Sequence, residues 1–65
     1  MSKFKVIDKD GAIHYVEADR PEYLGIHGVD HVRFYRWNQE KGQKDWIDQP
    51  PIPVPNRQSV QVVEE

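Results

Sequence analysis

The chain has 65 residues, of which 31% are charged and 37% hydrophobic, and it contains no cysteine. This length allows one small domain, and the missing cysteines exclude disulfide bridges, thiolate metal sites and cysteine nucleophiles. With a formal charge of −2, the chain lacks the excess of Lys and Arg that strong phosphate binding needs. Mixed polar sequence follows Met1 and no long apolar run occurs, which predicts a cytoplasmic protein without a membrane span.

The apolar residues favour strands over helices. Eight Val and five Ile stand against one Leu, one Met and two Ala, and β-branched side chains are enriched in strands. We therefore expect residues 1–65 to form a single, mainly β domain of about four to five antiparallel strands with one short helical turn. The expected architecture is an SH3-like open barrel or, alternatively, a twisted sheet that dimerises.

The first hairpin signal is the stretch 8–11, Asp-Lys-Asp-Gly, which has the composition of a type I turn followed by a left-handed glycine. Closing the hairpin over this stretch pairs Ile7 with Ala12. Because side chains alternate along a strand, the register predicts a shared core face for Phe4, Val6, Ile13 and Tyr15.

Residues 19–25 carry the signals of one helical turn. Asp19 is a candidate N-cap, Glu22 completes a capping box and Gly25 is a candidate stop signal. We therefore expect a single turn of helix here, before a long strand that runs from Val29 to Asn38.

The second hairpin turns over residues 39–42, which again end in glycine. With Asn38 opposite Gln43, the register gives an aromatic pair and two pairs of opposite charge, all of which favour pairing. The predicted pairs are Trp37 with Lys44, Arg36 with Asp45, Tyr35 with Trp46, Phe34 with Ile47 and Arg33 with Asp48. The two aspartates are thus expected to neutralise the two arginines.

Prolines dominate residues 49–57, and we expect this segment to be extended and polyproline-like. Residues 50–53 fit the PxxP pattern, but a stiff connector across the sheet explains the same composition. Residues 58–65 are predicted to form a short C-terminal strand and an acidic end. Val60 and Val62 would then face the core, and Glu64 and Glu65 would lie near Lys3 and Lys5 if this strand pairs with the first.

A group of aromatic and basic side chains is the main candidate for a binding surface. On the predicted register, three rings share one sheet face with Arg33, and exposed apolar patches of this kind mark interaction surfaces. The candidate binding residues are Arg33, Tyr35, Arg36, Trp37, Lys44 and Trp46. The leading hypothesis is a small non-catalytic protein-interaction module or regulatory adaptor.

Other occupants of this face stay open. Single-stranded nucleic acid would stack its bases on the rings, with Lys41 among the assisting cations. A methylated lysine held by aromatic walls, or a second copy in a homo-oligomer, are further candidates. Alternatively, the rings form a second small core that the proline-rich segment covers.

Metal binding and catalysis have little support in the sequence. His27 and His31 are four residues apart, but a third ligand would have to come from His14, Asp19 or Asp30. The chain has no nucleophile elbow, phosphate loop or zinc-protease motif. We therefore expect no metal, no cofactor and no enzymatic activity.

Overall fold

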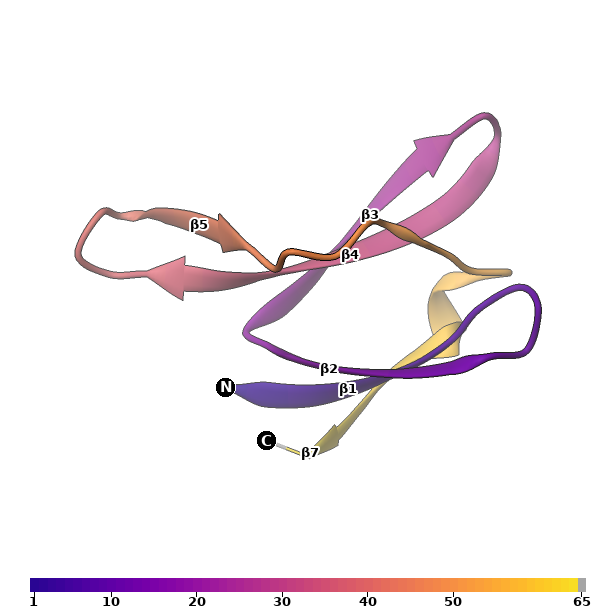
Figure 1. Cartoon of the computed structure of the whole chain (residues 1–65), viewed down its shortest axis with the longest axis horizontal. Coiled ribbons are helices and arrows are strands. Elements are labelled where there is room, and N and C mark those ends of the chain that lie inside the picture. The colour runs from indigo at the N-terminus through magenta and orange to yellow at the C-terminus, as the bar shows by residue number, and fades with distance from the viewer. Residues whose placement is uncertain (65) are drawn as a thin grey trace.

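The computed structural model describes residues 1–64 as two antiparallel sheets (Figure 1). The first sheet has the order β2-β1-β7, and the second has the order β3-β4-β5, with β6 also paired to β4. The bounds are β1 Ser2–Ile7, β2 Ile13–Ala18, β3 Arg20–Ile26, β4 Val29–Asn38, β5 Gln43–Trp46, β6 Ile52–Pro53, the 3-10 helix η1 Arg57–Ser59 and β7 Val60–Glu64. The mainly β prediction is confirmed, with seven strands rather than four or five.

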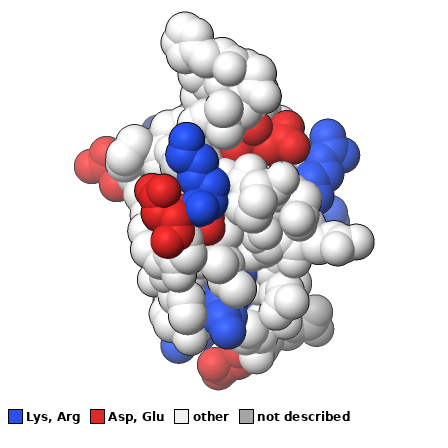
Figure 2. Space-filling model, turned by 90° about the vertical axis from the view of Figure 1, so that its right-hand side faces the viewer, with Lys and Arg blue, Asp and Glu red and all other residues white. Residues whose placement is uncertain are grey.

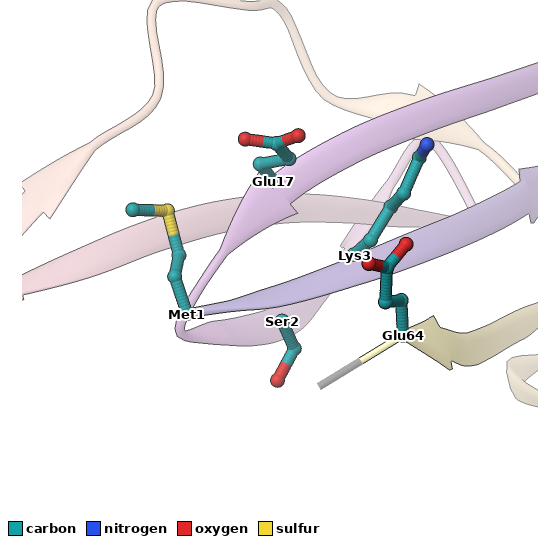
Figure 3. A pocket seen from close by; sticks show the side chains of 5 residues that line it. All are labelled: Met1, Ser2, Lys3, Glu17 and Glu64. Carbon is teal, nitrogen blue, oxygen red and sulfur yellow. The ribbon is translucent and has the colours of Figure 1, made fainter.

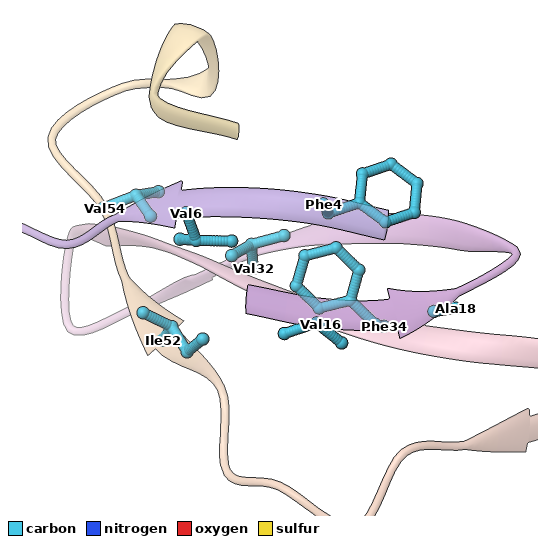
Figure 4. Close-up of a cluster of buried hydrophobic side chains, with 8 residues drawn as sticks. All are labelled: Phe4, Val6, Val16, Ala18, Val32, Phe34, Ile52 and Val54. Atoms are coloured by element: carbon cyan, nitrogen blue, oxygen red, sulfur yellow. The ribbon is translucent and has the colours of Figure 1, made fainter. Parts of the chain in front are cut away.

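The core lies between the sheets and is entirely apolar (Figure 4). Its buried members are Phe4, Val6, Val16, Ala18, Val32, Phe34, Ile52 and Val54. The Phe4 and Phe34 rings, one from each sheet, have centroids 5.2 Å apart. Strands β1, β2 and β4 and the proline-rich segment therefore meet in one core.

The predicted register of the first hairpin is wrong by one residue. The Asp8 N–H donates to the Ala12 carbonyl at 3.0 Å, so these two residues pair and the loop between them is residues 9–11. Gly11, with φ 87°, is the last loop residue. Ile7 consequently pairs with Ile13 instead of Ala12. A one-residue slip moves every side chain of a strand to the other face, so Val16 and Ala18 are buried, whereas Ile13 and Tyr15 are exposed.

The helical turn predicted for residues 19–25 is also wrong, because this stretch is mostly the strand β3. Asp19 does accept a backbone hydrogen bond, but from the Trp37 N–H of β4 at 2.7 Å and not from a helix of its own. The single described helical turn is η1, near the C-terminus. Strand β3 continues into β4 through a two-residue turn, in which His27 and Gly28 both have positive φ, 52° and 76°.

The long strand and the second hairpin are confirmed. Strand β4 has the predicted bounds, and its register with β5 matches prediction from Asn38↔Gln43 to Tyr35↔Trp46. The Ile47 N–H still donates to the Phe34 carbonyl at 3.0 Å, but the ladder ends there. The chain then bends, and Arg33 pairs with Glu22 of β3. The expected neutralisation of Arg33 by Asp48 is therefore wrong.

The proline-rich segment follows the edge of the second sheet and does not cross its face. Ile52 and Pro53 pair with the first half of β4, and the Val54 N–H donates to the Asp30 carbonyl at 2.8 Å. Because Ile52 and Val54 are buried in the core, the segment serves as a structural connector.

The C-terminal strand β7 pairs with β1, which meets the condition set in the sequence analysis, and places Glu64 opposite Lys3. Val60 packs against the core. Val62 is 49% exposed, which corrects its predicted core position. The expectation for Glu65 lies outside the described residues.

Candidate binding face

The hairpin of β4 and β5 projects from the body of the molecule as an arm (Figure 1). Alternation along β4 sends Phe34 into the core and the odd-numbered side chains to the other side of the sheet. We call this outer side the aromatic face. It is formed by Glu22, Arg33, Tyr35, Trp37, Lys44 and Trp46.

Five of the six predicted binding residues therefore share one face, and Arg36 does not. Arg36 has the same parity as Phe34, and its Nη2 reaches the Glu17 carbonyl at 3.4 Å. Although Arg36 is opposite Asp45 in the ladder, it makes no ion pair with that carboxylate among the described residues. Its guanidinium instead contacts the end of β2.

The rings and cations of the aromatic face are stacked on each other. The guanidinium carbon of Arg33 lies 3.6 Å from the centroid of the Trp46 ring. Tyr35 meets Trp46 edge to face at 5.3 Å between centroids, and the Lys44 amine lies 4.9 Å from the centre of the Tyr35 ring. Contacts of this geometry are favourable by about 0.5–1.5 kcal/mol for ring pairs and about 0.5–1 kcal/mol for exposed cations.

Glu22 of β3 holds both cations in place. Its carboxylate accepts a hydrogen bond from Lys44 at 2.8 Å and lies 3.5 Å from the Arg33 guanidinium. The hydrogen bond from Lys44 lowers the pKa of Glu22 below its usual range, and the same bond raises the pKa of Lys44. Sequence reasoning missed this role because it placed Glu22 in a helical turn. Recognising β3 would have put Glu22 opposite Arg33.

Both indole rings remain accessible. Trp37 is 50% and Trp46 is 40% exposed. The proline-rich segment pairs with β4 at His31 and Val32, at the end of β4 remote from Trp37. It therefore does not cover the rings, and the alternative of a second core beneath it is wrong.

The histidines have local roles. His27 lies in the β3–β4 turn, and His31 Nδ1 is 2.8 Å from the Val29 carbonyl oxygen. His14 Nε2 is 2.8 Å from the Asp8 carboxylate, and this hydrogen bond is the main reason that the pKa of Asp8 is lowered. Within residues 1–64, no three side chains of metal-binding type come together.

A separate hollow of about 170 Å³ opens beside the N-terminus (Figure 3). It is lined by Met1, Ser2, Lys3, Glu17 and Glu64. Lys3 lies opposite Glu17 on β2 and opposite Glu64 on β7. The hollow is open and small compared with ligand pockets of roughly 300–1,000 Å³.

The end of the molecule opposite the arm has mixed charge. Acidic and basic side chains are interspersed there, with uncharged surface between them (Figure 2). None of the helical structure in residues 1–64 is long and apolar enough to span a membrane. Comparison of the chain with family models, curated proteins and solved structures gives no match.

Proposed function

We propose that this protein is a non-catalytic, cytoplasmic protein-interaction module that binds its partner through the aromatic face. The observation that carries the proposal is the exposure of Trp37 and Trp46 on a projecting arm, beside Tyr35 and Arg33. Trp, Tyr and Arg are the residue types that anchor protein interfaces, because they bury large areas at low entropic cost. A regulatory adaptor is the corresponding biological role.

The electrostatics of the face favour a protein over single-stranded nucleic acid. Glu22 partly neutralises Arg33 and Lys44, whereas phosphate binding needs cations that are free to neutralise phosphates and so displace the counterions of the nucleic acid. Arg33 also covers one side of the Trp46 ring, which a stacking base would need. A protein partner needs neither free cations nor an uncovered Trp46 ring, and it loses less side-chain entropy when it binds rings that are already ordered.

The connectivity supports the proposed SH3-like architecture. Strand β2 runs into β3 across the single residue Asp19 and so passes from the first sheet to the second. After η1, the chain returns to pair β7 with β1. Two sheets joined in this way at a bent strand resemble a small open barrel. The SH3-like assignment stays a prediction.

Replacing Trp37 by alanine tests the proposal. Because half of the Trp37 side chain is already in solvent, we expect Trp37→Ala to fold normally by circular dichroism and to lose capture of partner proteins from lysate. Tyr15→Ala is the matched control, since Tyr15 is an exposed ring on the other sheet. Undiminished capture by Trp37→Ala would contradict the proposal.

The same reagents separate the alternative occupants. Binding of a mixed oligonucleotide pool that moves the two indole N–H signals and disappears at high salt would indicate nucleic acid. A molecular mass that rises with protein concentration and falls in Trp37→Ala would indicate a homo-oligomer. Either result would replace the proposed partner class.

A further inference from the structure

Strand β5 has an open edge next to the aromatic face. The Ile47 N–H donates to the Phe34 carbonyl, so the even-numbered residues of β4 direct their backbone groups toward β5. Because hydrogen-bonded pairs alternate along an antiparallel ladder, the backbone groups of Gln43 and Asp45 point toward β4 and bond to Asn38 and Arg36. The N–H and C=O groups of Lys44 and Trp46 therefore face away from β4, along the outer edge of the arm.

Other edges of the second sheet are protected, but β5 is not. Strand β3 contains Pro21, and β6 contains Pro53, and a proline offers no N–H to an added strand. An edge lysine also discourages pairing, yet the Lys44 amine is drawn back over the sheet by its 2.8 Å bond to Glu22. All four residues of β5 are exposed.

A second copy of the chain does not fit this edge. Two copies of β5 can pair antiparallel so that the outward N–H and C=O groups of Lys44 and Trp46 are all used. In that register, Lys44 of each copy lies opposite Trp46 of the other, and the two Asp45 residues lie opposite each other. Like charges directly opposite each other destabilise a pair of strands. The occupant that fits is therefore a strand of different sequence.

Asp45 defines the chemistry of that strand. Its carboxylate accepts a hydrogen bond from the Asn38 amide at 3.0 Å, and in residues 1–64 it has no ion-pair partner. A basic side chain opposite Asp45 on an added strand would form an ion pair with its carboxylate. The neighbouring positions of the added strand would lie on the aromatic face, beside Trp46 and the stem of Lys44, where apolar side chains fit.

From these contacts, and on the basis of the proposed function, we infer that β5 binds an extended peptide segment as an additional antiparallel strand. The segment has the alternation apolar, basic, apolar, with its basic residue opposite Asp45. Main-chain hydrogen bonds to Lys44 and Trp46 supply affinity, and the side chains supply specificity.

The test uses the synthetic peptide acetyl-Ser-Thr-Leu-Lys-Leu-Thr-Ser-amide and NMR of the labelled full chain. We expect the backbone amides of Lys44 and Trp46 to shift and to become protected from hydrogen exchange. N-methylation of both leucines should abolish binding, because it removes the N–H groups that face β5. Replacing the central lysine of the peptide by glutamate should weaken binding by about tenfold, since an attraction becomes a repulsion of similar size.

Asp45→Asn is the matched variant of the protein. It keeps the size of the side chain and should bind the lysine and glutamate peptides about equally. No binding at millimolar peptide, or equal binding of the N-methylated peptide, would overturn the inference. Protection of the Lys44 and Trp46 amides that rises with protein concentration alone would also overturn it, in favour of self-pairing.

Failure of this inference is distinguishable from failure of the proposed function. If Trp37→Ala abolishes partner capture but the peptide does not protect the β5 amides, strand addition is wrong and the aromatic face remains the binding surface. If the peptide protects those amides but Trp37→Ala still captures its partners, the aromatic-face proposal is wrong.

Discussion

A matched pair of threonine variants tests the register of β1 and β2. Val16 is 5% exposed in the core, and Ile13 is 53% exposed on the opposite face of the same strand. Val16→Thr keeps the shape of the side chain and buries a hydroxyl, at a cost of about 1–3 kcal/mol without a partner. Ile13→Thr keeps the β-branch in solvent, where substitutions change stability by less than about 0.5 kcal/mol.

Urea unfolding followed by far-ultraviolet circular dichroism measures both effects. A domain of this size has a free energy of unfolding of roughly 3–10 kcal/mol, so a loss of about 2 kcal/mol for Val16→Thr is readily detected. An unchanged m-value would show that the denatured state is unaffected. If Ile13→Thr were the more destabilising variant, or if the two cost the same, the register described above would be refuted.

Two further predictions concern the turn and the charges of the second sheet. Gly28→Ala should lower the free energy of unfolding by about 1–2 kcal/mol, because φ at Gly28 is 76°. Gly25→Ala is the control and should cost less, because Gly25 has an ordinary φ and open space around it. Equal losses for the two variants in urea unfolding would contradict the argument from backbone strain at Gly28. The lowered pKa of Glu22 means that its stabilising effect is present above the ordinary carboxylate pKa and is lost as pH falls through the lowered value. NMR of the Trp46 indole should report this titration in the native protein and lose it in Glu22→Gln, and an unchanged profile in the variant would show that another group titrates.

The second hairpin was predictable because several independent constraints select one register. The aromatic pair of Tyr35 with Trp46 and the position of Gly42 agree on Asn38 opposite Gln43, and the structure has that pairing, although neither of the two predicted Arg–Asp ion pairs forms among the described residues. The first hairpin offers only alternation, and both faces of β2 contain apolar residues. Ile13 and Val16 are equally suitable for a core by composition. The register of β1 with β2 is then decided by the loop, which has three residues, the last of them Gly11, and not four.

Strand β3 was missed because its signals have two meanings. An aspartate followed three residues later by a glutamate is typical of a helix start. Here the Asp19 carboxylate instead accepts a hydrogen bond from the Trp37 backbone N–H across the sheet, and the Glu22 carboxylate accepts one from the Lys44 amine. The signal that identifies β3 is the His-Gly pair at residues 27–28, which lies between Ile26 and Val29 and is suited to a two-residue turn.

The chemistry of the aromatic face depends on that concealed strand. Two cations beside three rings, taken without β3, favour a surface for single-stranded nucleic acid. Glu22 changes this, because it draws Arg33 and Lys44 onto the rings and offsets part of their charge. The cations then order Tyr35 and Trp46, so less side-chain entropy is lost when a partner binds. Asp45, at the edge of β5, has no ion-pair partner within residues 1–64, and in the inferred strand addition its negative charge favours a basic strand over a phosphate backbone.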